Sequence, residues 1–321
     1  MAMEGSVTTA LNFVQRAGRD GKSTPRINKT GTDDSQIETM VAAALPITVR
    51  DARAMTPSPP TLDRHGFALL PLATTVDFDS LQQIQNVYYP EMERLVQRAT
   101  GAERVVLFDH TLRRITPESA QAAAGGAGIG VASIGGWATA PVNRVHGDYT
   151  LAGGPRRVTQ LSEPSASGSF GESPPLTPEE AAEIVSGDRR FAVVNVWRST
   201  AQGSVAVETQ PLAVLDCSSV LDEDLFTVEL VFTDRIGQNL GVDGSAAHHR
   251  WYHYSSMAPE ECLLFKAFDN TTDDAITGRF ALHSSFDHPG TTDSSPPRES
   301  IECRLLAIYP KDEERESQSK L

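Results

Sequence analysis

The sequence predicts a mainly β protein of the barrel or jelly-roll kind with flanking helices. Short β-type segments separated by turn clusters fill the chain from Phe191 onward, and no long helix is expected between them. This spacing favours a barrel or jelly roll over alternating βαβ units. The expected strands are Phe191–Arg198, Ala213–Asp216, Leu225–Phe232, His249–Ser255, Glu261–Phe268, Phe280–His283 and Ile301–Tyr309.

Two strands and two helices are expected ahead of these segments. The strands are Phe67–Leu72 and Arg104–Phe108. Ser80–Thr100 has the apolar spacing of a helix, and Gly101 follows it as a stop. Thr177–Glu180 has the pattern of a capping box with Pro at the first helical position, so a further helix is expected over Ala181–Ser186.

The ends of the chain differ in composition from its middle. Residues 1–60 are rich in Ser, Thr, Asp and small residues, and we expect a weakly structured extension with a short helix near Ala10–Gln15. Part of Gln36–Ala44 is expected to form a helix or a strand. Residues 61–310 are expected to form a single domain, and the charged tail 311–321 is expected to be frayed.

Charge and cysteine content exclude several kinds of partner. The formal net charge of the 321 residues is −14, which argues against nucleic acid or an anionic membrane as a partner. Three cysteines form no zinc motif and leave an odd thiol, so a reducing compartment fits best. The chain has neither a signal-peptide pattern nor an apolar run of 18 residues, and the cytoplasm is the expected location.

A glycine-rich segment, Ala122–Gly136, precedes the residues of greatest chemical interest. A phosphate-binding loop needs a Gly-Lys-Ser/Thr sequence or a strand leading into a Gly-x-Gly-x-x-Gly pattern, and this segment has neither. We therefore expect a flexible loop, or a lid over a small substrate.

His146 and Asp148 form a His-x-Asp pair. Side chains two residues apart on an extended strand project to the same face, so both can bind one ion. One more histidine would complete a 2-His-1-carboxylate set, which is typical of non-haem Fe(II) oxygenases. His283 is the expected second histidine and His253 is its rival, whereas His288 lies in a Pro/Gly turn. A zinc site formed by His249 and His253 would need a helix, and the neighbouring aromatic residues favour a strand.

An arginine follows the second histidine by 15 residues. Arg298 stands at the head of the last expected strand, where its guanidinium could bind a carboxylate in a bidentate manner. Ser300 could add a hydroxyl group. Arg304 and Arg198 are alternative anion-binding residues, and an ordinary surface salt bridge is the other explanation for any of the three.

Seven segments of the chain resemble one known family in sequence and in order. They are DHTLR (Asp109–Arg113), RVHGDYT (Arg144–Thr150), NVWR (Asn195–Arg198), PLA (Pro211–Ala213), HRWY (His249–Tyr252), LFKAFD (Leu264–Asp269) and PRESIE (Pro297–Glu302). From about Phe67 to Tyr309 the chain resembles the asaB-type hydroxylase/desaturase family. That family includes a bacterial cephalosporin methoxylase component and fungal endoperoxide-forming and ring-forming oxygenases. Gly147 is a departure, because bulkier residues are common between the two ligands, and we expect it to loosen the backbone there.

The resemblance implies a double-stranded β-helix of the cupin-like kind that binds Fe(II), 2-oxoglutarate and O2. It implies a tailoring enzyme of secondary metabolism that abstracts hydrogen from a C–H bond, with hydroxylation, desaturation or ring closure as the result. His146, Asp148 and His283 would hold the iron, and Arg298 would bind the cosubstrate. His110, Arg113 and Trp197 match family positions and could line the pocket, as could Arg198 and His253; core packing is the alternative for the aromatic residues.

Two other functions remain open from the residues alone. A cupin-like metal enzyme that does not use 2-oxoglutarate would keep the three ligands without needing Arg298. A non-catalytic β-barrel that binds a small molecule would need neither. In each case the expected partner is a small molecule, with a homodimer as an option for assembly.

Overall fold

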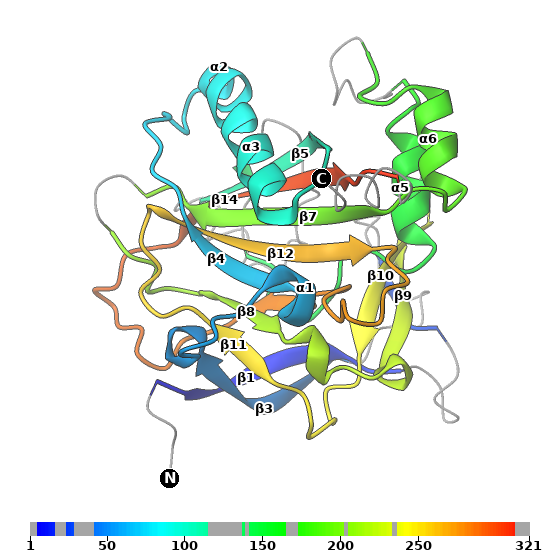
Figure 1. Cartoon of the computed structure of the whole chain (residues 1–321). Helices are drawn as coiled ribbons and strands as arrows, with labels where there is room; N and C mark the ends of the chain where they lie inside the picture. Colours follow the sequence, from blue (N-terminus) through cyan, green and yellow to red (C-terminus); the bar gives the residue numbers. More distant parts are fainter. Residues whose placement is uncertain are drawn as a thin grey trace.

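The computed structural model describes residues 5–16, 24–28, 42–114, 137–138, 141–164, 173–201, 205–232 and 236–311. A six-stranded sheet forms the upper layer in Figure 1. Its order is β4 (Phe67–Pro71), β12 (Glu261–Asp269), β7 (Phe191–Ser199), β14 (Glu299–Ile308), β5 (Arg104–Arg114) and β6 (Trp137–Ala138). All neighbours are antiparallel except β5 and β6.

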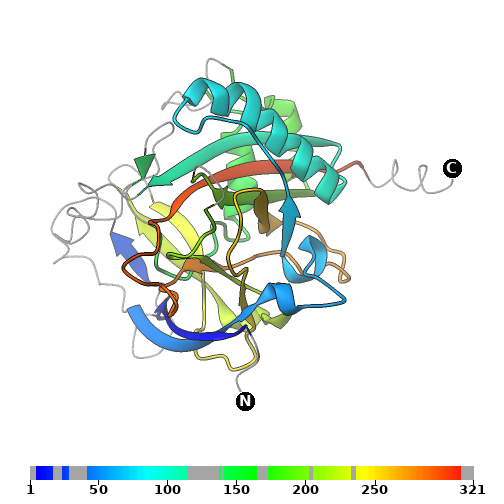
Figure 2. The same ribbon diagram turned by 90° about the vertical axis from the view of Figure 1, so that its left-hand side faces the viewer.

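A five-stranded sheet forms the lower layer. Its order is β1 (Val7–Val14), β3 (Ala42–Asp51), β11 (Trp251–His253), β8 (Leu212–Leu215) and β13 (His283–Ser285). A third sheet joins β10 (Ile236–Val242), β9 (Leu225–Val231) and β2 (Arg26–Asn28). The turned view in Figure 2 shows that the first two sheets are separate layers of one strand-built body.

One apolar cluster joins the two larger sheets. Trp197 and Phe265 of the six-stranded sheet pack in the same cluster as Val214 and Tyr252 of the five-stranded sheet. Side chains alternate along a strand, so β7 places Trp197 and Asn195 toward this side and Val196 toward the other. The interior between the sheets therefore receives every second residue of β7 and β14.

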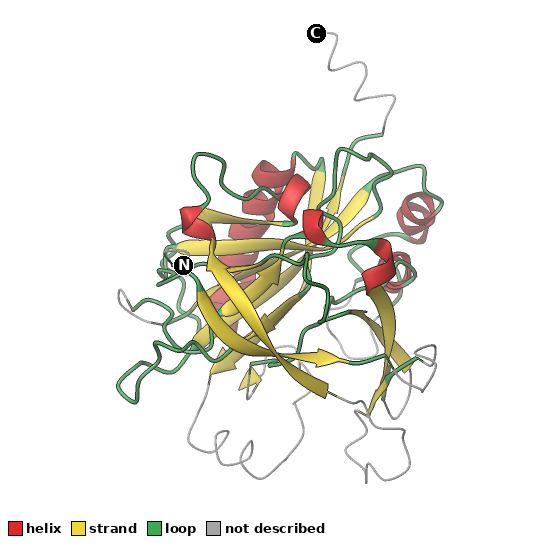
Figure 3. Cartoon of the chain, turned by 90° about the horizontal axis from the view of Figure 1, so that it is seen from below, coloured by secondary structure: helices red, strands yellow, loops and turns green. Residues whose placement is uncertain are grey.

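Helices cover the six-stranded sheet from outside, as the view from below shows (Figure 3). Helix α2 (Leu81–Gln83), the π-helical turn Ile84–Tyr88 and α3 (Tyr89–Thr100) form one continuous helical segment that ends at the left-handed Gly101. Met92, Leu95 and Val96 of α3 pack on the sheet. The helix expected over Ser80–Thr100 is thereby confirmed.

Two further helices cover one end of the same sheet. These are α5 (Gly153–Gln160) and α6 (Pro178–Val185), and both belong to the cluster around Phe191 and Phe268. The side chain and backbone of Thr177 and Glu180 form a reciprocal capping box at the start of α6, as expected from the sequence. The short α1 (Leu62–His65) begins at Thr61, whose side chain accepts a hydrogen bond from the Arg64 amide, and it ends at the left-handed Gly66.

The expected weak structure of residues 1–60 is wrong for the part that the structure describes. β1 pairs with β3 over eight residues, from Val7 opposite Val49 to Val14 opposite Ala42, and Leu11 and Phe13 are buried. The helix expected near Ala10–Gln15 is therefore a strand. Polar residues interrupt the apolar pattern of this segment, but Leu11 and Phe13 face a core supplied by distant strands.

Most of the remaining expectations on secondary structure are confirmed. The expected strands are present with boundary shifts of a few residues, and β5 continues to Arg114. The sequence did not indicate β10, because two glycines weaken its strand pattern. A Cβ atom at Gly241 would lie 2.6 Å from the ring of Phe226, so a larger residue there would displace that ring. The glycine-rich Ala122–Gly136 and tail residues 312–321 lie outside the described residues. None of the described helices is long and apolar enough to cross a membrane.

Candidate metal centre

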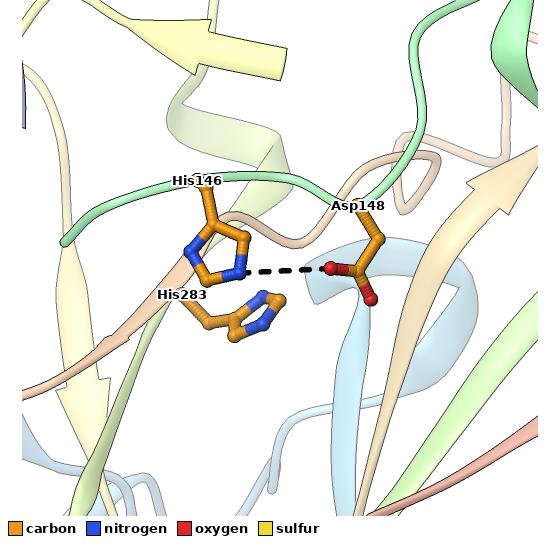
Figure 4. A group of neighbouring side chains, drawn as sticks. All are labelled: His146, Asp148 and His283. Atoms are coloured by element: carbon orange, nitrogen blue, oxygen red, sulfur yellow. Dashed lines mark ion pairs between the residues drawn. The ribbon is translucent and has the colours of Figure 1, made fainter. Parts of the chain in front are cut away.

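His146, Asp148 and His283 meet between the sheets. The backbones of His146 and His283 form an antiparallel bridge, with N–O distances of 3.1 and 2.9 Å, so the two rings start side by side. Their centroids are 4.5 Å apart, and His146 Nε2 lies 3.6 Å from Asp148 Oδ1. One possible ligand atom from each of the three residues lies within 4.8 Å of the others, and Figure 4 shows the three side chains converging.

Backbone carbonyls orient both histidine rings. His146 Nδ1 lies 2.8 Å from the carbonyl oxygen of Arg144, and His283 Nδ1 lies 3.1 Å from that of Ala281. When each Nδ1 donates its proton to the carbonyl, Nε2 keeps a free lone pair. This is the usual outer-shell arrangement of metal-binding histidines. Burial, and then the neighbouring His283, lower the pKa of His146 to about 3, so this ring is neutral at neutral pH.

Asp148 is held as a carboxylate by the inner face of the six-stranded sheet. Asn195 Nδ2 of β7 donates a hydrogen bond of 2.7 Å to Asp148 Oδ2, and Arg304 Nε of β14 lies 3.6 Å from the same oxygen. Burial alone would raise the pKa of Asp148. The positive charge of Arg304 and the Asn195 hydrogen bond outweigh that effect and hold the pKa below its usual range.

Gly147, between the two ligands, does not loosen the backbone as expected. Its amide and carbonyl groups both bond to Leu240 of β10, at 2.8 Å each. A Cβ atom at this position would lie 3.1 Å from the Cβ atom of Leu240. Glycine allows a close approach to β10 at this point, and the approach fixes the segment that carries His146 and Asp148.

These observations fit an Fe(II) ion. Two imidazoles with free Nε2 atoms and one ionised carboxylate occupy one side of the centre, which matches the ligand set of 2-His-1-carboxylate sites. The rival His253 lies elsewhere: its ring faces Phe286 and His288 at centroid distances of 5.5 and 5.6 Å. The assignment of the three residues as ligands remains a prediction.

A small cavity beside the two histidines is lined by arginines. Its volume is about 30 Å³, and its walls include His146, His283, Trp197 and three arginines, Arg113, Arg298 and Arg304. A dicarboxylic acid is larger than this space, so its binding requires lining side chains to move. A larger cavity of about 400 Å³ lies beside Arg198. None of the three proposed ligands lines it.

Arg298 is the arginine of this cavity that keeps hydrogen-bonding capacity. It is 5% exposed, it donates a hydrogen bond of 2.6 Å to the carbonyl oxygen of Gln210, and it lies 5.5 Å from the centre of the Trp197 ring. Its Nε atom is buried without a partner among the described residues, and the same is true of Ser300 Oγ. Burial, followed by the nearby charge of Arg113, lowers the pKa of Arg298.

Arg304 has a different environment. It donates to Asp109 at 3.0 Å and to Glu302 at 2.6 Å, in addition to its approach to Asp148. Its charge is therefore already neutralised, and we assign it to holding Asp148 rather than to binding the cosubstrate.

The other predicted pocket residues divide between two faces of the sheet. Arg113 and Trp197 line the cavity beside the ligands. His110 lies on the helix-covered face, where its Nδ1 is 2.5 Å from the hydroxyl oxygen of Tyr89. Arg198 also points to that face and donates to the carbonyl oxygens of Leu72 and Pro259. The prediction that Arg198 and His110 line the pocket was wrong. Side chains alternate between the two faces of a strand, and each of these residues follows one whose side chain points inward, so its own side chain points outward. His253 lines a separate cavity with His288.

Two inward-facing residues of the site were not predicted. Asn195 is two residues before Trp197, and Glu302 is two residues before Arg304, so strand alternation could have identified both. A second group, Asp224, His248 and His249, also brings three possible ligand atoms together, at the start of β9. His249 bonds to Asp224 rather than meeting His253, so the disfavoured zinc pairing of His249 with His253 does not exist in the structure.

The sequence of this chain is similar to known proteins over most of its length. A family model described as an oxidoreductase/YMDC permease-like domain matches residues 11–308. The hydroxylase/desaturase CTB9 of Cercospora beticola is 31% identical over 79% of this chain and 74% of its own length. The chain belongs to the hydroxylase/desaturase family. The hydroxylase/desaturase efuI of Hormonema carpetanum is 28% identical over 97% of both chains.

This chain also shares its fold with a solved structure. The iron and α-ketoglutarate-dependent endoperoxidase NvfI matches with a TM-score of 0.74 over 96% of this chain and 100% of that chain, at 22% identity. The double-stranded β-helix and the family expected from the sequence are thereby confirmed.

Proposed function

We propose that this protein is an Fe(II)/2-oxoglutarate-dependent oxygenase in which His146, Asp148 and His283 bind the iron. The observation that carries the proposal is the pair of free Nε2 atoms beside one ionised carboxylate, with an arginine-lined cavity next to them. Relatives aligned over 77% of the chain are described as α-ketoglutarate-dependent and Fe(II)/2-oxoglutarate-dependent dioxygenases. They bear out the expected enzyme class and the cofactors Fe(II), 2-oxoglutarate and O2.

Each residue of the site has a defined task. The iron, when bound with 2-oxoglutarate and O2, supplies the oxidising chemistry that removes hydrogen from a C–H bond. The Arg144 and Ala281 carbonyls hold the histidine Nε2 atoms toward the centre. Asn195 and Arg304 keep Asp148 ionised and oriented.

Arg298 would bind the far carboxylate of 2-oxoglutarate. Its unpaired Nε and the unpaired hydroxyl of Ser300 are the donors that a carboxylate in this cavity would satisfy. The packing of Trp197 against Arg298 would keep water away from that ion pair.

The substrate is a small molecule of secondary metabolism, oxidised at an aliphatic carbon. We expect a modified amino acid or a terpenoid or polyketide intermediate, with hydroxylation, desaturation or ring closure as the outcome. The cytoplasm remains the proposed location, since all three cysteines are buried free thiols. A homodimer remains an expectation.

The test is a substrate screen with the purified iron enzyme, 2-oxoglutarate and isotopically labelled O2. We expect succinate formation coupled to oxidation of a small metabolite. A product that gains one labelled oxygen atom indicates hydroxylation, and loss of hydrogen without oxygen indicates desaturation or ring closure. Demethylation of a peptide or nucleobase with no turnover of any small metabolite would contradict the proposal.

A further inference from the structure

Asp148 belongs to the walls of a second cavity, which shares no lining residue with the arginine-lined cavity described above. This second cavity has a volume of about 210 Å³ and lies between α5 and the β9–β10 hairpin. His146 and Asp148 are only two residues apart, yet they line different cavities. The candidate metal centre therefore has one cavity on its histidine side and another on its carboxylate side.

The carboxylate-side cavity is basic in an acidic protein. The whole chain has 42 acidic and 28 basic residues, excluding histidine. Helix α5 contributes Arg156 and Arg157 to the wall, and among the described residues that line it Asp148 is the only acidic one. Because a bound metal ion would neutralise Asp148, the wall would carry a net positive charge.

Arg157 is the better placed of the two arginines. Its guanidinium carbon lies 5.7 Å from the centre of the Phe108 ring, and its charge acts on the neighbouring side chain of Tyr149, the residue after Asp148. Its Nε atom is buried without a partner among the described residues. The side chain is thus held in place while part of its hydrogen-bonding capacity stays unused, which is typical of a prepared anion site.

The opposite wall combines apolar side chains with the side-chain amides of Gln238 and Asn239. Leu230, Phe232 and Ile236 of the β9–β10 hairpin face the cavity across from α5. A volume of about 210 Å³ is smaller than that of pockets that enclose a whole drug-sized ligand, and it suits one end of a larger molecule.

We infer that this cavity binds an anionic group of the substrate, and that the substrate is an organic acid with an apolar framework. A carboxylate or a phosphate would serve, because Arg157 recognises either. The inference rests on the proposed function, since it takes the metal centre as the place of reaction. Binding of the anion at Arg157 places the rest of the molecule beside Asp148, while 2-oxoglutarate occupies the cavity of Arg298.

The test uses three probes with one aromatic framework: 2-naphthoate, 2-naphthyl phosphate and the neutral 2-naphthamide. Their affinities are measured by calorimetry on the full chain with Fe(II) under anaerobic conditions, with and without saturating 2-oxoglutarate. We expect at least one anionic probe to bind about tenfold more tightly than the amide, with 2-oxoglutarate present. The tighter of the two anions identifies the preferred acid.

Three variants locate the binding. Arg157→Met should abolish the preference for the anion, Arg157→Lys should retain part of it, and Arg298→Leu should leave it unchanged. Equal affinity for the amide, or loss of the preference in Arg298→Leu alone, would overturn the inference. Failure of the proposed function is distinguishable, because it would appear as absence of Fe(II) binding or of 2-oxoglutarate binding, whether or not the anionic probe binds.

Discussion

Two charge clusters of this protein, each built around buried side chains, differ in how many of their polar and charged groups have a partner. The first joins Lys266 and Asp269, both 0% exposed, to Asp63 and Arg190. Lys266 Nζ lies 2.8 Å from a carboxylate oxygen of each aspartate, and Arg190 donates two hydrogen bonds to Asp269. Two positive and two negative charges are therefore matched within the chain.

The second cluster surrounds the candidate metal centre and is left incomplete. Arg304 is matched by Glu302 and Asp109, but three neighbouring groups have no partner among the described residues. These are Arg298 Nε, Ser300 Oγ and Asn195 Oδ1. Buried polar groups are normally hydrogen-bonded, and exceptions need an explanation.

The difference separates structural charge from functional charge. The Lys266 cluster ties α1 to β12 and needs nothing from outside. The cluster beside His146 and His283 leaves the buried donors of Arg298 and Ser300 without a partner among the described residues, which is the arrangement expected of a prepared binding site. Mutations in the first should change stability alone, and mutations in the second should change binding.

The largest effect is expected at the proposed ligands. His146→Ala, Asp148→Ala and His283→Ala should each abolish turnover and lose most of the bound iron, because each removes one of three protein ligands. His253→Ala is the matched control, since it also removes a buried imidazole but should keep the iron. Metal analysis of the four purified variants decides the matter, and full iron occupancy in His283→Ala would move the second histidine elsewhere.

Lys266→Met should destabilise the fold without affecting the iron. We expect the free energy of unfolding to fall by about 3 kcal/mol. This is the lower end of the range for a broken buried ion pair, because Arg190 still neutralises Asp269. Lys311→Met is the control: it removes an ion pair with Glu183 whose lysine side chain is 50% exposed, and it should change stability by less than about 1 kcal/mol. Urea unfolding measures both variants, and equal effects would show that the Lys266 cluster is not structural.

Arg298→Leu should weaken the cosubstrate specifically. Loss of a guanidinium from a desolvated carboxylate is typically worth about 2–5 kcal/mol, so we expect the apparent constant for 2-oxoglutarate to rise by roughly two to three orders of magnitude. Iron should remain bound. An unchanged constant would assign the role to Arg113 or Arg304, the other arginines of that cavity.

Asn195→Ala should have the smallest effect of the series. It removes the hydrogen bond to Asp148 but no ligand, and loss of such an outer-shell partner typically costs about 10–100-fold in metal affinity or activity. Asn270→Ala is the control, because Asn270 accepts a hydrogen bond from the Phe191 amide away from the site. Iron titrations that gave the same affinity for both variants would show that Asn195 does not support the metal.

Strand alternation predicted much of the fold and site. The His-x-Asp pair placed His146 and Asp148 on one face, and the long β segments were visible in the local sequence. Arg198 and His110 were misplaced because the family motif marks a strand without stating which face each residue takes. Neighbouring residues such as Trp197 and Arg198 point in opposite directions.

What could not be predicted depends on contacts between distant segments. β1 and β3 are strands because they pair with each other and pack with β8 and β11. Gly147 has a fixed backbone because β10, about 90 residues later, bonds to it on both sides. No local pattern contains these contacts.

The central claim is that three ligands and one arginine together form a site for iron and a 2-oxo acid. An anaerobic titration of the protein with Fe(II) and then 2-oxoglutarate, followed by visible absorption, tests it most directly. The account predicts a new absorption band for the wild type, no band for His283→Ala, and a band for Arg298→Leu only at much higher 2-oxoglutarate. A wild-type protein that bound iron but gave no band at any 2-oxoglutarate concentration would contradict the account.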